Sequence, residues 1–116
     1  MSDSPQADAS IDNRRTWLER ATQISRTMVT AAESGDWERV QALAAERKPL
    51  VTDAFAGELS AEARDALASS LRRLAHLNDQ LIELAAVARD ERAEQIQQVR
   101  GGRRAASAYA SCAGTA

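Results

Sequence analysis

Apolar residues recur along the chain at intervals of three and four, the spacing that places them on one face of an α-helix. The first such face comprises Trp17, Ala21, Ile24, Met28 and Ala31. Asp12 is a good N-cap residue for this helix, and Thr16 followed by Glu19 fits a capping box and offers an alternative start. The helix is expected to end at Ser34 and Gly35, because glycine readily adopts the left-handed conformation after a last turn.

A second helix is predicted from the N-cap residue Asp36 to Gly57. Its apolar stripe consists of Trp37, Val40, Leu43, Ala44, Leu50, Val51 and Ala54. Pro49 falls within this stretch, and proline in a helix interior costs about 3 kcal/mol because it removes a donor and clashes with the preceding turn. The helix therefore either kinks at Pro49 or divides in two, and the kink is favoured because Lys48 would be a poor cap for a new helix.

The third predicted helix is long, because neither glycine nor proline interrupts residues 61–100. Ser60 is its expected N-cap residue, and 40 helical residues span about 60 Å. Its apolar stripe consists of Leu67, Leu71, Leu74, Leu77, Leu81, Leu84, Ala85 and Ala88. The leucine-rich first half is expected to pack on the other two helices, and the charged second half to project or to pack loosely.

Gly101 and Gly102 are expected to break this helix and to act as a hinge. Residues 103–111 then form a short, mobile C-terminal helix that carries Tyr109. The predicted fold is all-α, an up-and-down bundle of three main helices, the third long, plus this short helix. The predicted divisions are a disordered N-terminal tail (1–11), a helical bundle (12–100), and a hinge, short lid helix and tail (101–116).

Composition and charge argue for a cytoplasmic, protein-binding chain. The 116 residues include 15 basic and 17 acidic side chains, and a net charge of −2 gives no general attraction to nucleic acid or to anionic membranes. A single cysteine cannot form an internal disulfide. No secretion signal is visible at the N-terminus, and no apolar stretch approaches the roughly 18 residues that a membrane span needs. We therefore expect neither a nucleic-acid partner nor membrane insertion.

Residues that carry chemistry are scarce and isolated. His76 is the one histidine and Cys112 the one cysteine, and neither has partners at ligand or catalytic spacing. The sequence therefore predicts no enzyme activity, no metal and no cofactor. A small basic cluster consists of Arg100, Arg103 and Arg104. Cations are favourable near the C-terminus of a helix, and we also expect this cluster to dock on an acidic surface of a partner protein. Asn78, within the leucine stripe, either fixes helix register or lines a groove for a partner.

Three short segments resemble the FliT family, the export chaperones of the flagellar filament-cap protein. They are Ser34 to Glu38, with the order Ser-Gly-Asp-Trp-Glu; Leu77 to Leu81, with Leu-Asn-Asp-Gln-Leu; and Arg100 to Tyr109. The resemblance covers about residues 12–111. Pro49 departs from the family's pattern.

The resemblance implies a chaperone that binds the C-terminal segment of the cap protein FliD in an apolar groove. The chaperone would prevent premature assembly and deliver its cargo to the type III export gate FlhA, with contacts to the export ATPase complex. We assign the groove to one face of the long helix, and its residues are Leu67, Leu71, Leu74, Asn78, Leu81 and Ala85. The C-terminal helix would act as a lid over this groove, and the expected oligomeric state is a monomer or weak homodimer.

The resemblance also implies that Tyr109 serves export-gate docking, together with Arg103 and Arg104 on the lid. A tyrosine that only anchors the lid is the alternative. At the level of the whole protein, the alternatives are a helical regulatory or adaptor protein and a chaperone of another late flagellar substrate.

Overall fold

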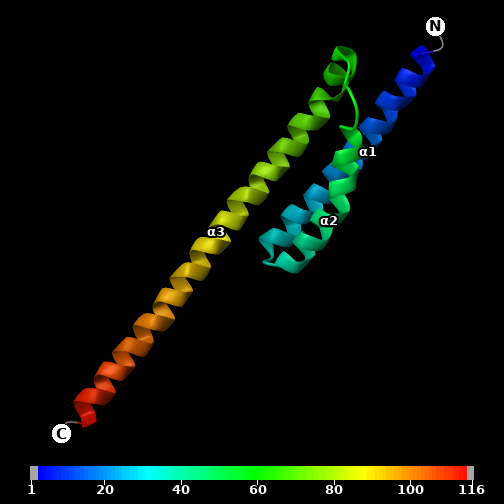
Figure 1. Ribbon diagram of the computed structural model, residues 1–116. Coiled ribbons are helices and arrows are strands. Elements are labelled where there is room, and N and C mark those ends of the chain that lie inside the picture. The colour runs from blue at the N-terminus through cyan, green and yellow to red at the C-terminus, as the bar shows by residue number, and fades with distance from the viewer. Residues whose placement is uncertain (1–2, 115–116) are drawn as a thin grey trace. The chain divides into compact units, whose positions relative to one another are not determined.

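The computed structural model describes the backbone of residues 3–114 and the side chains of residues 10–110. Three helices follow one another, α1 (Asp3–Glu33), α2 (Trp37–Ala54) and α3 (Ala61–Gly114) (Figure 1). No strand occurs in the described residues, so the predicted all-α class and the long third helix are confirmed. The chain divides between Leu84 and Ala85 into two units, the first holding α1, α2 and the start of α3, and the second the rest of α3.

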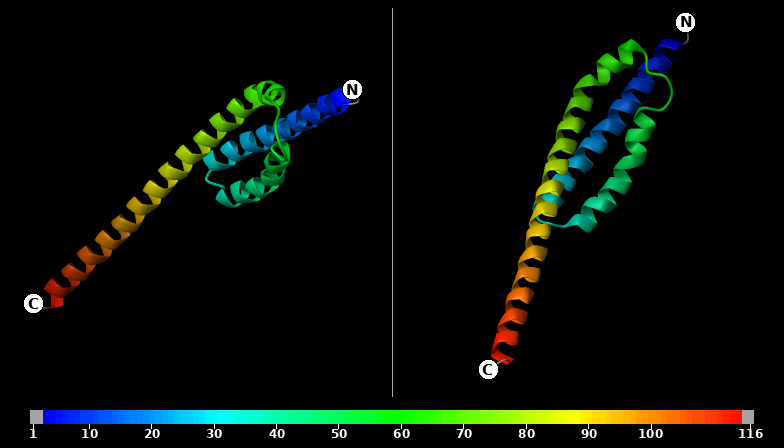
Figure 2. Two further views of the ribbon diagram at one scale, coloured as in Figure 1. Left: turned by 45° about the horizontal axis from the view of Figure 1, so that its top comes forward. Right: turned by 60° about the vertical axis from the view of Figure 1, so that its left-hand side comes forward.

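The turn between α1 and α2 has the capping geometry that its sequence predicts. Gly35 has a φ of +77°, and its N–H donates to Ala32 O at 3.0 Å while the N–H of Asp36 donates to Ala31 O at 2.9 Å. These two bonds define a Schellman motif. The Asp36 carboxylate then accepts from the N–H of Arg39 at 3.2 Å and so caps α2. The two helices lie side by side and antiparallel (Figure 2).

Two small apolar clusters hold the first unit together. The first joins Leu18 of α1, Ala54 of α2 and Leu67 of α3, with Trp17 and Phe55 packed against it. The second has three buried members, Met28, Ala32 and Leu81, surrounded by half-buried residues. Since each cluster has only three buried members and one of them is an alanine, each cluster buries little apolar area, and the stability of the fold depends on few large residues.

The buried face of α1 includes two polar residues that apolar periodicity does not identify. Thr22 and Ser25 are 5% and 0% exposed. The Thr22 hydroxyl donates to Leu18 O at 2.7 Å within its own helix. The Ser25 hydroxyl accepts from the Arg47 guanidinium of α2 at 3.1 Å. Both hydroxyls can be buried because they are hydrogen-bonded.

Arg14 connects α1 to the C-terminal end of α2. Its two terminal nitrogens donate to Ala54 O at 2.6 Å and to Ala56 O at 2.7 Å. The last carbonyls of a helix have no partners within the helix, and a cation is favourable at that end. Arg14 therefore fixes the segment after α2 against α1, a role that sequence patterning did not reveal.

Replacing Arg14 with methionine is expected to lower the free energy of unfolding by about 1.5–3 kcal/mol, the usual contribution of hydrogen bonds to a charged group. Chemical unfolding measures this directly. Arg15→Met is the matched control, because Arg15 makes only an exposed pair with Asp12 at 3.3 Å and such pairs contribute about 0–1 kcal/mol. Equal effects of the two substitutions would contradict the proposed role of Arg14.

The start of α1 differs from the predicted one, while α2 agrees with the favoured alternative of one helix that contains Pro49. Helix α1 begins at Asp3, nine residues before Asp12. Helix α2 is a single helix with Pro49 inside it, so proline does not divide it. Proline leaves the carbonyl of Ala45 without its helical N–H partner, and that cost is tolerated in a helix packed along one side.

The expected break at Gly101 and Gly102 is absent from this structure, where α3 continues through both glycines to Gly114. Neither glycine has a positive φ, and a Cβ at either position would meet nothing within 4 Å. Glycine costs about 1 kcal/mol in a helix relative to alanine, and the neighbouring arginines and alanines are strong helix formers. A double glycine thus weakens the helix without dictating a break.

Candidate functional site

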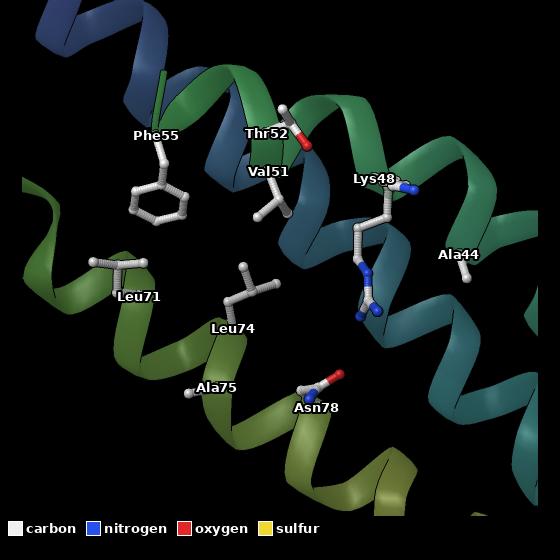
Figure 3. A pocket seen from close by; sticks show the side chains of 10 residues that line it. Ala44, Lys48, Val51, Thr52, Phe55, Leu71, Leu74, Ala75 and Asn78 are labelled. Carbon is white, nitrogen blue, oxygen red and sulfur yellow. The ribbon is translucent and has the colours of Figure 1, made fainter. Parts of the chain in front are cut away.

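An apolar groove lies between α2 and α3 in the first unit. It has a volume of about 740 Å³. Its lining residues come from both helices and from the residue that follows α2, and they are Ala44, Arg47, Lys48, Val51, Thr52, Phe55, Leu71, Leu74, Ala75 and Asn78. In Figure 3 the side chains of Val51 of α2 and of Phe55, the residue directly after α2, point toward Leu71 and Leu74 of α3. These apolar side chains form the centre of the groove.

The structure separates the six groove residues that we assigned to α3 into three groups. Leu71, Leu74 and Asn78 line the groove. Leu67 and Leu81 are 0% and 7% exposed and belong to the two core clusters instead. Ala85 is half-buried in the second unit.

The side chain of Asn78 lies at one end of the groove (Figure 3). It is exposed, and it forms no side-chain hydrogen bond with another described residue. Of the two predicted roles, lining a groove therefore fits its position, since a residue that fixes helix register is expected to be buried and bonded across helices.

The groove residues of α2 were absent from our sequence-based assignment. The spacing of apolar residues at every third or fourth position identified Val51 and Ala44 as members of an apolar stripe. This spacing does not show whether a helix face is fully covered by another helix or partly exposed to solvent. In the structure, Ala54 is the buried residue of α2, while Val51 and Phe55 are half-buried. The open side of α2 is what makes a groove between α2 and α3.

Arg47 brings a positive charge into this apolar surface. Its guanidinium donates to the Ser25 hydroxyl at 3.1 Å, and no carboxylate of the described side chains lies within ion-pairing distance. Burial lowers the pKa of Arg47 below its usual value, because a charged group loses solvation there. Arginine remains charged throughout the physiological range, so the groove contains a partly desolvated cation that is held by a neutral hydroxyl.

The second unit presents exposed residues on α3. Every described side chain from Arg89 to Ala110 is exposed, and Tyr109 is 79% exposed. A shallow depression of about 350 Å³ runs beside Ile96 and Val99, and Arg103 lines it. The docking residues expected from the family resemblance thus lie in a solvent-accessible part of α3.

The remaining candidates for chemistry show no partner groups among the described residues. His76 is exposed, and no group of three histidine, cysteine, aspartate or glutamate side chains that could hold a metal occurs in the described part of the chain. The side chain of Cys112 lies outside the described residues. None of the described helices combines the length and apolar character required to cross a lipid bilayer.

Comparison with known proteins gives one result. The model of the family described as flagellar protein FliT matches residues 16–111. Searches against curated proteins and against solved structures gave no significant match. The matched region includes the Gly35–Asp36 turn, the groove between α2 and α3, and Tyr109. By the extent of this match, the chain belongs to the FliT family of flagellar proteins.

Proposed function

We propose that this protein is a type III export chaperone that binds the C-terminal segment of the filament-cap protein FliD in the groove between α2 and α3. Membership of the FliT family supports the flagellar role, and the groove supports a binding function. The observation that carries the proposal is the set of four facing apolar side chains in one unit, Val51 of α2, Phe55 directly after it, and Leu71 and Leu74 of α3. Such a surface suits a peptide that presents a row of apolar side chains.

Binding to this groove would also explain how premature assembly is prevented. A segment whose apolar side chains are covered by the chaperone is not free to contact other copies of the cap protein. The loaded chaperone would then dock at the export gate FlhA, with Tyr109 and the nearby arginines as the contact and the export ATPase complex as a further partner. The exposure of Tyr109 supports this role, because an aromatic ring left in water is a favourable interface contact.

The proposed lid requires α3 to open at Gly101 and Gly102 so that the C-terminal residues cover the groove. Replacing both glycines with alanine is expected to keep the helix intact, since each change favours helix by about 1 kcal/mol and there is space for both methyl groups. If the lid is closed about 90% of the time, removing closure strengthens apparent cargo affinity about tenfold.

Calorimetry with the FliD segment tests this prediction in two ways. The double alanine variant and a chain that ends at Val99 should both bind more tightly than the wild-type protein. Unchanged or weaker binding by both variants would exclude a lid hinged at these glycines. Ala105→Gly is a control that weakens the same helix outside the proposed hinge.

The function itself is tested by affinity purification from motile cells that express the tagged protein. Recovery of FliD by the wild-type chain, and its loss when the C-terminal segment of FliD is deleted, is the expected result. Recovery of a different late flagellar substrate would identify that substrate as the cargo. Recovery of regulatory proteins without any export substrate would favour the alternative of a helical adaptor.

A further inference from the structure

The groove contains a positive charge that the proposed function does not by itself require. A groove that bound only apolar side chains of the cargo would need only apolar lining residues. Here Arg47 and Lys48 line the groove, and no acidic residue is present among the described lining residues. Both cations therefore belong to the same lining as the apolar side chains of Val51 and Leu74.

The position of Arg47 is defined by the fold. Its contact on α1 is Ser25, which is fully buried, and the two groups are 3.1 Å apart. A guanidinium has five N–H donors, and the Ser25 hydroxyl uses one of them. Ser25 therefore directs the guanidinium while leaving donors for another acceptor. Arg47 is half-buried, so the charge is partly shielded from water and interacts more strongly with an opposite charge than a surface cation does.

We propose that Arg47 is a specificity-determining residue that binds a carboxylate of the cargo, an Asp or Glu side chain flanked by apolar residues in the segment that occupies the groove. This proposal rests on the proposed function and deepens it by stating the chemistry of the cargo. Arginine pairs with a carboxylate through two parallel hydrogen bonds, which fixes both position and orientation. The carboxylate thereby sets the register of the cargo, while the apolar side chains fill the centre of the groove.

Charge complementarity favours such a partner over the chain's own C-terminal residues. Residues 101–110 contain Arg103 and Arg104 and neither aspartate nor glutamate. If this segment enters the groove as a lid, it brings further positive charge toward Arg47 and Lys48. An acidic cargo segment is therefore the better electrostatic match, and it has an advantage in competition with the lid.

Calorimetry with the purified protein and the C-terminal segment of FliD tests the proposal. Arg47→Met keeps much of the side-chain volume and removes the charge, and it is expected to weaken binding at least tenfold. Arg39→Met is the matched control, because Arg39 is an exposed arginine of the same helix that does not line the groove, and its expected effect is below threefold. Arg47→Lys retains the charge without the planar fork and should recover part of the lost affinity. Thermal unfolding of each variant confirms that the fold is intact.

A double-mutant cycle identifies the carboxylate. Each Asp or Glu of the segment is changed in turn to Asn or Gln, and every peptide is measured against the wild-type protein and Arg47→Met. One substitution is expected to weaken binding to the wild type about tenfold and to have little further effect on Arg47→Met. An Arg47→Met effect below twofold, or additive effects for every carboxylate, would overturn the proposal while leaving the cargo assignment intact.

Two other outcomes have distinct meanings. Absence of binding between the wild-type protein and the segment overturns the proposed function and this proposal with it. Self-association of the wild-type protein in analytical ultracentrifugation that Arg47→Met abolishes would assign the groove to a second copy of the chain, and it would likewise overturn the proposal.

Discussion

Leu67→Ala is expected mainly to lower stability and Leu74→Ala mainly to weaken cargo binding, although both leucines belong to one predicted stripe. Leu67 is fully buried in a cluster with Leu18 and Ala54, so its truncation should cost about 2–5 kcal/mol of unfolding free energy. Since domains are generally stable by only about 5–15 kcal/mol, this loss is large for a protein with a thin core. Leu74 is half-buried and lines the groove. Its truncation should cost less stability and weaken binding of the FliD segment at least tenfold.

Chemical unfolding and calorimetry on both variants separate these effects. Leu81→Ala provides a second core variant, because Leu81 is 7% exposed in the other cluster. Binding is measured at a temperature where each variant is folded. If Leu74→Ala lowers stability as much as Leu67→Ala and leaves affinity unchanged, then Leu74 is a core residue and the groove between α2 and α3 is not the cargo site.

Tyr109→Ala is expected to reduce docking of the loaded complex at the export gate at least tenfold, equivalent to about 1.4 kcal/mol, and to leave cargo binding unchanged. The physical reason is that 79% of the ring is exposed, so a partner can bury most of it on contact. Binding of the FliD-loaded protein to the cytoplasmic domain of FlhA measures docking. Calorimetry on the same variant measures cargo affinity.

The alternative role for Tyr109, an anchor that holds the lid closed, gives a different result. In that case Tyr109→Ala would raise cargo affinity and leave docking of the loaded complex at the wild-type level. Tyr109→Phe is a useful companion, since it retains the ring and removes the hydroxyl. Arg103→Ala and Arg104→Ala test whether the neighbouring cations contribute to the same contact.

Much of the fold was predictable because it depends on local interactions of individual residue types. The Gly35 turn and the Asp36 cap were predictable because each depends on one residue type and its immediate neighbours. The continuity of α3 over residues 61–100 followed from the absence of glycine and proline in that stretch. The continuation of the helix through Gly101 and Gly102 was not predictable in this way. A glycine pair destabilises a helix by only a small amount, and neighbouring residues with high helix propensity can offset it.

The site was less predictable because it depends on contacts between helices. Periodicity placed Leu67, Leu71, Leu74 and Leu81 on one stripe, yet the structure assigns Leu67 and Leu81 to the core and Leu71 and Leu74 to the groove. Which leucine is buried depends on where α1 and α2 cross that stripe. The pairing of Arg47 with Ser25 links residues 22 positions apart on different helices, and no pattern of spacing indicates it.

The most direct test of the central claim is to map the FliD segment on the protein by methyl NMR. Cargo binding in the groove predicts that the largest chemical-shift changes on titration fall on the methyl groups of Val51, Leu71 and Leu74, with smaller changes at the buried methyl groups of Leu18 and Leu67. It also predicts that Leu74→Ala removes most of the response at Val51. Two results would contradict the claim that the groove between α2 and α3 binds the cargo. One is the absence of chemical-shift changes at these groove methyl groups when the FliD segment is added to saturation. The other is a set of changes concentrated at Ile96 and Val99 of the second unit.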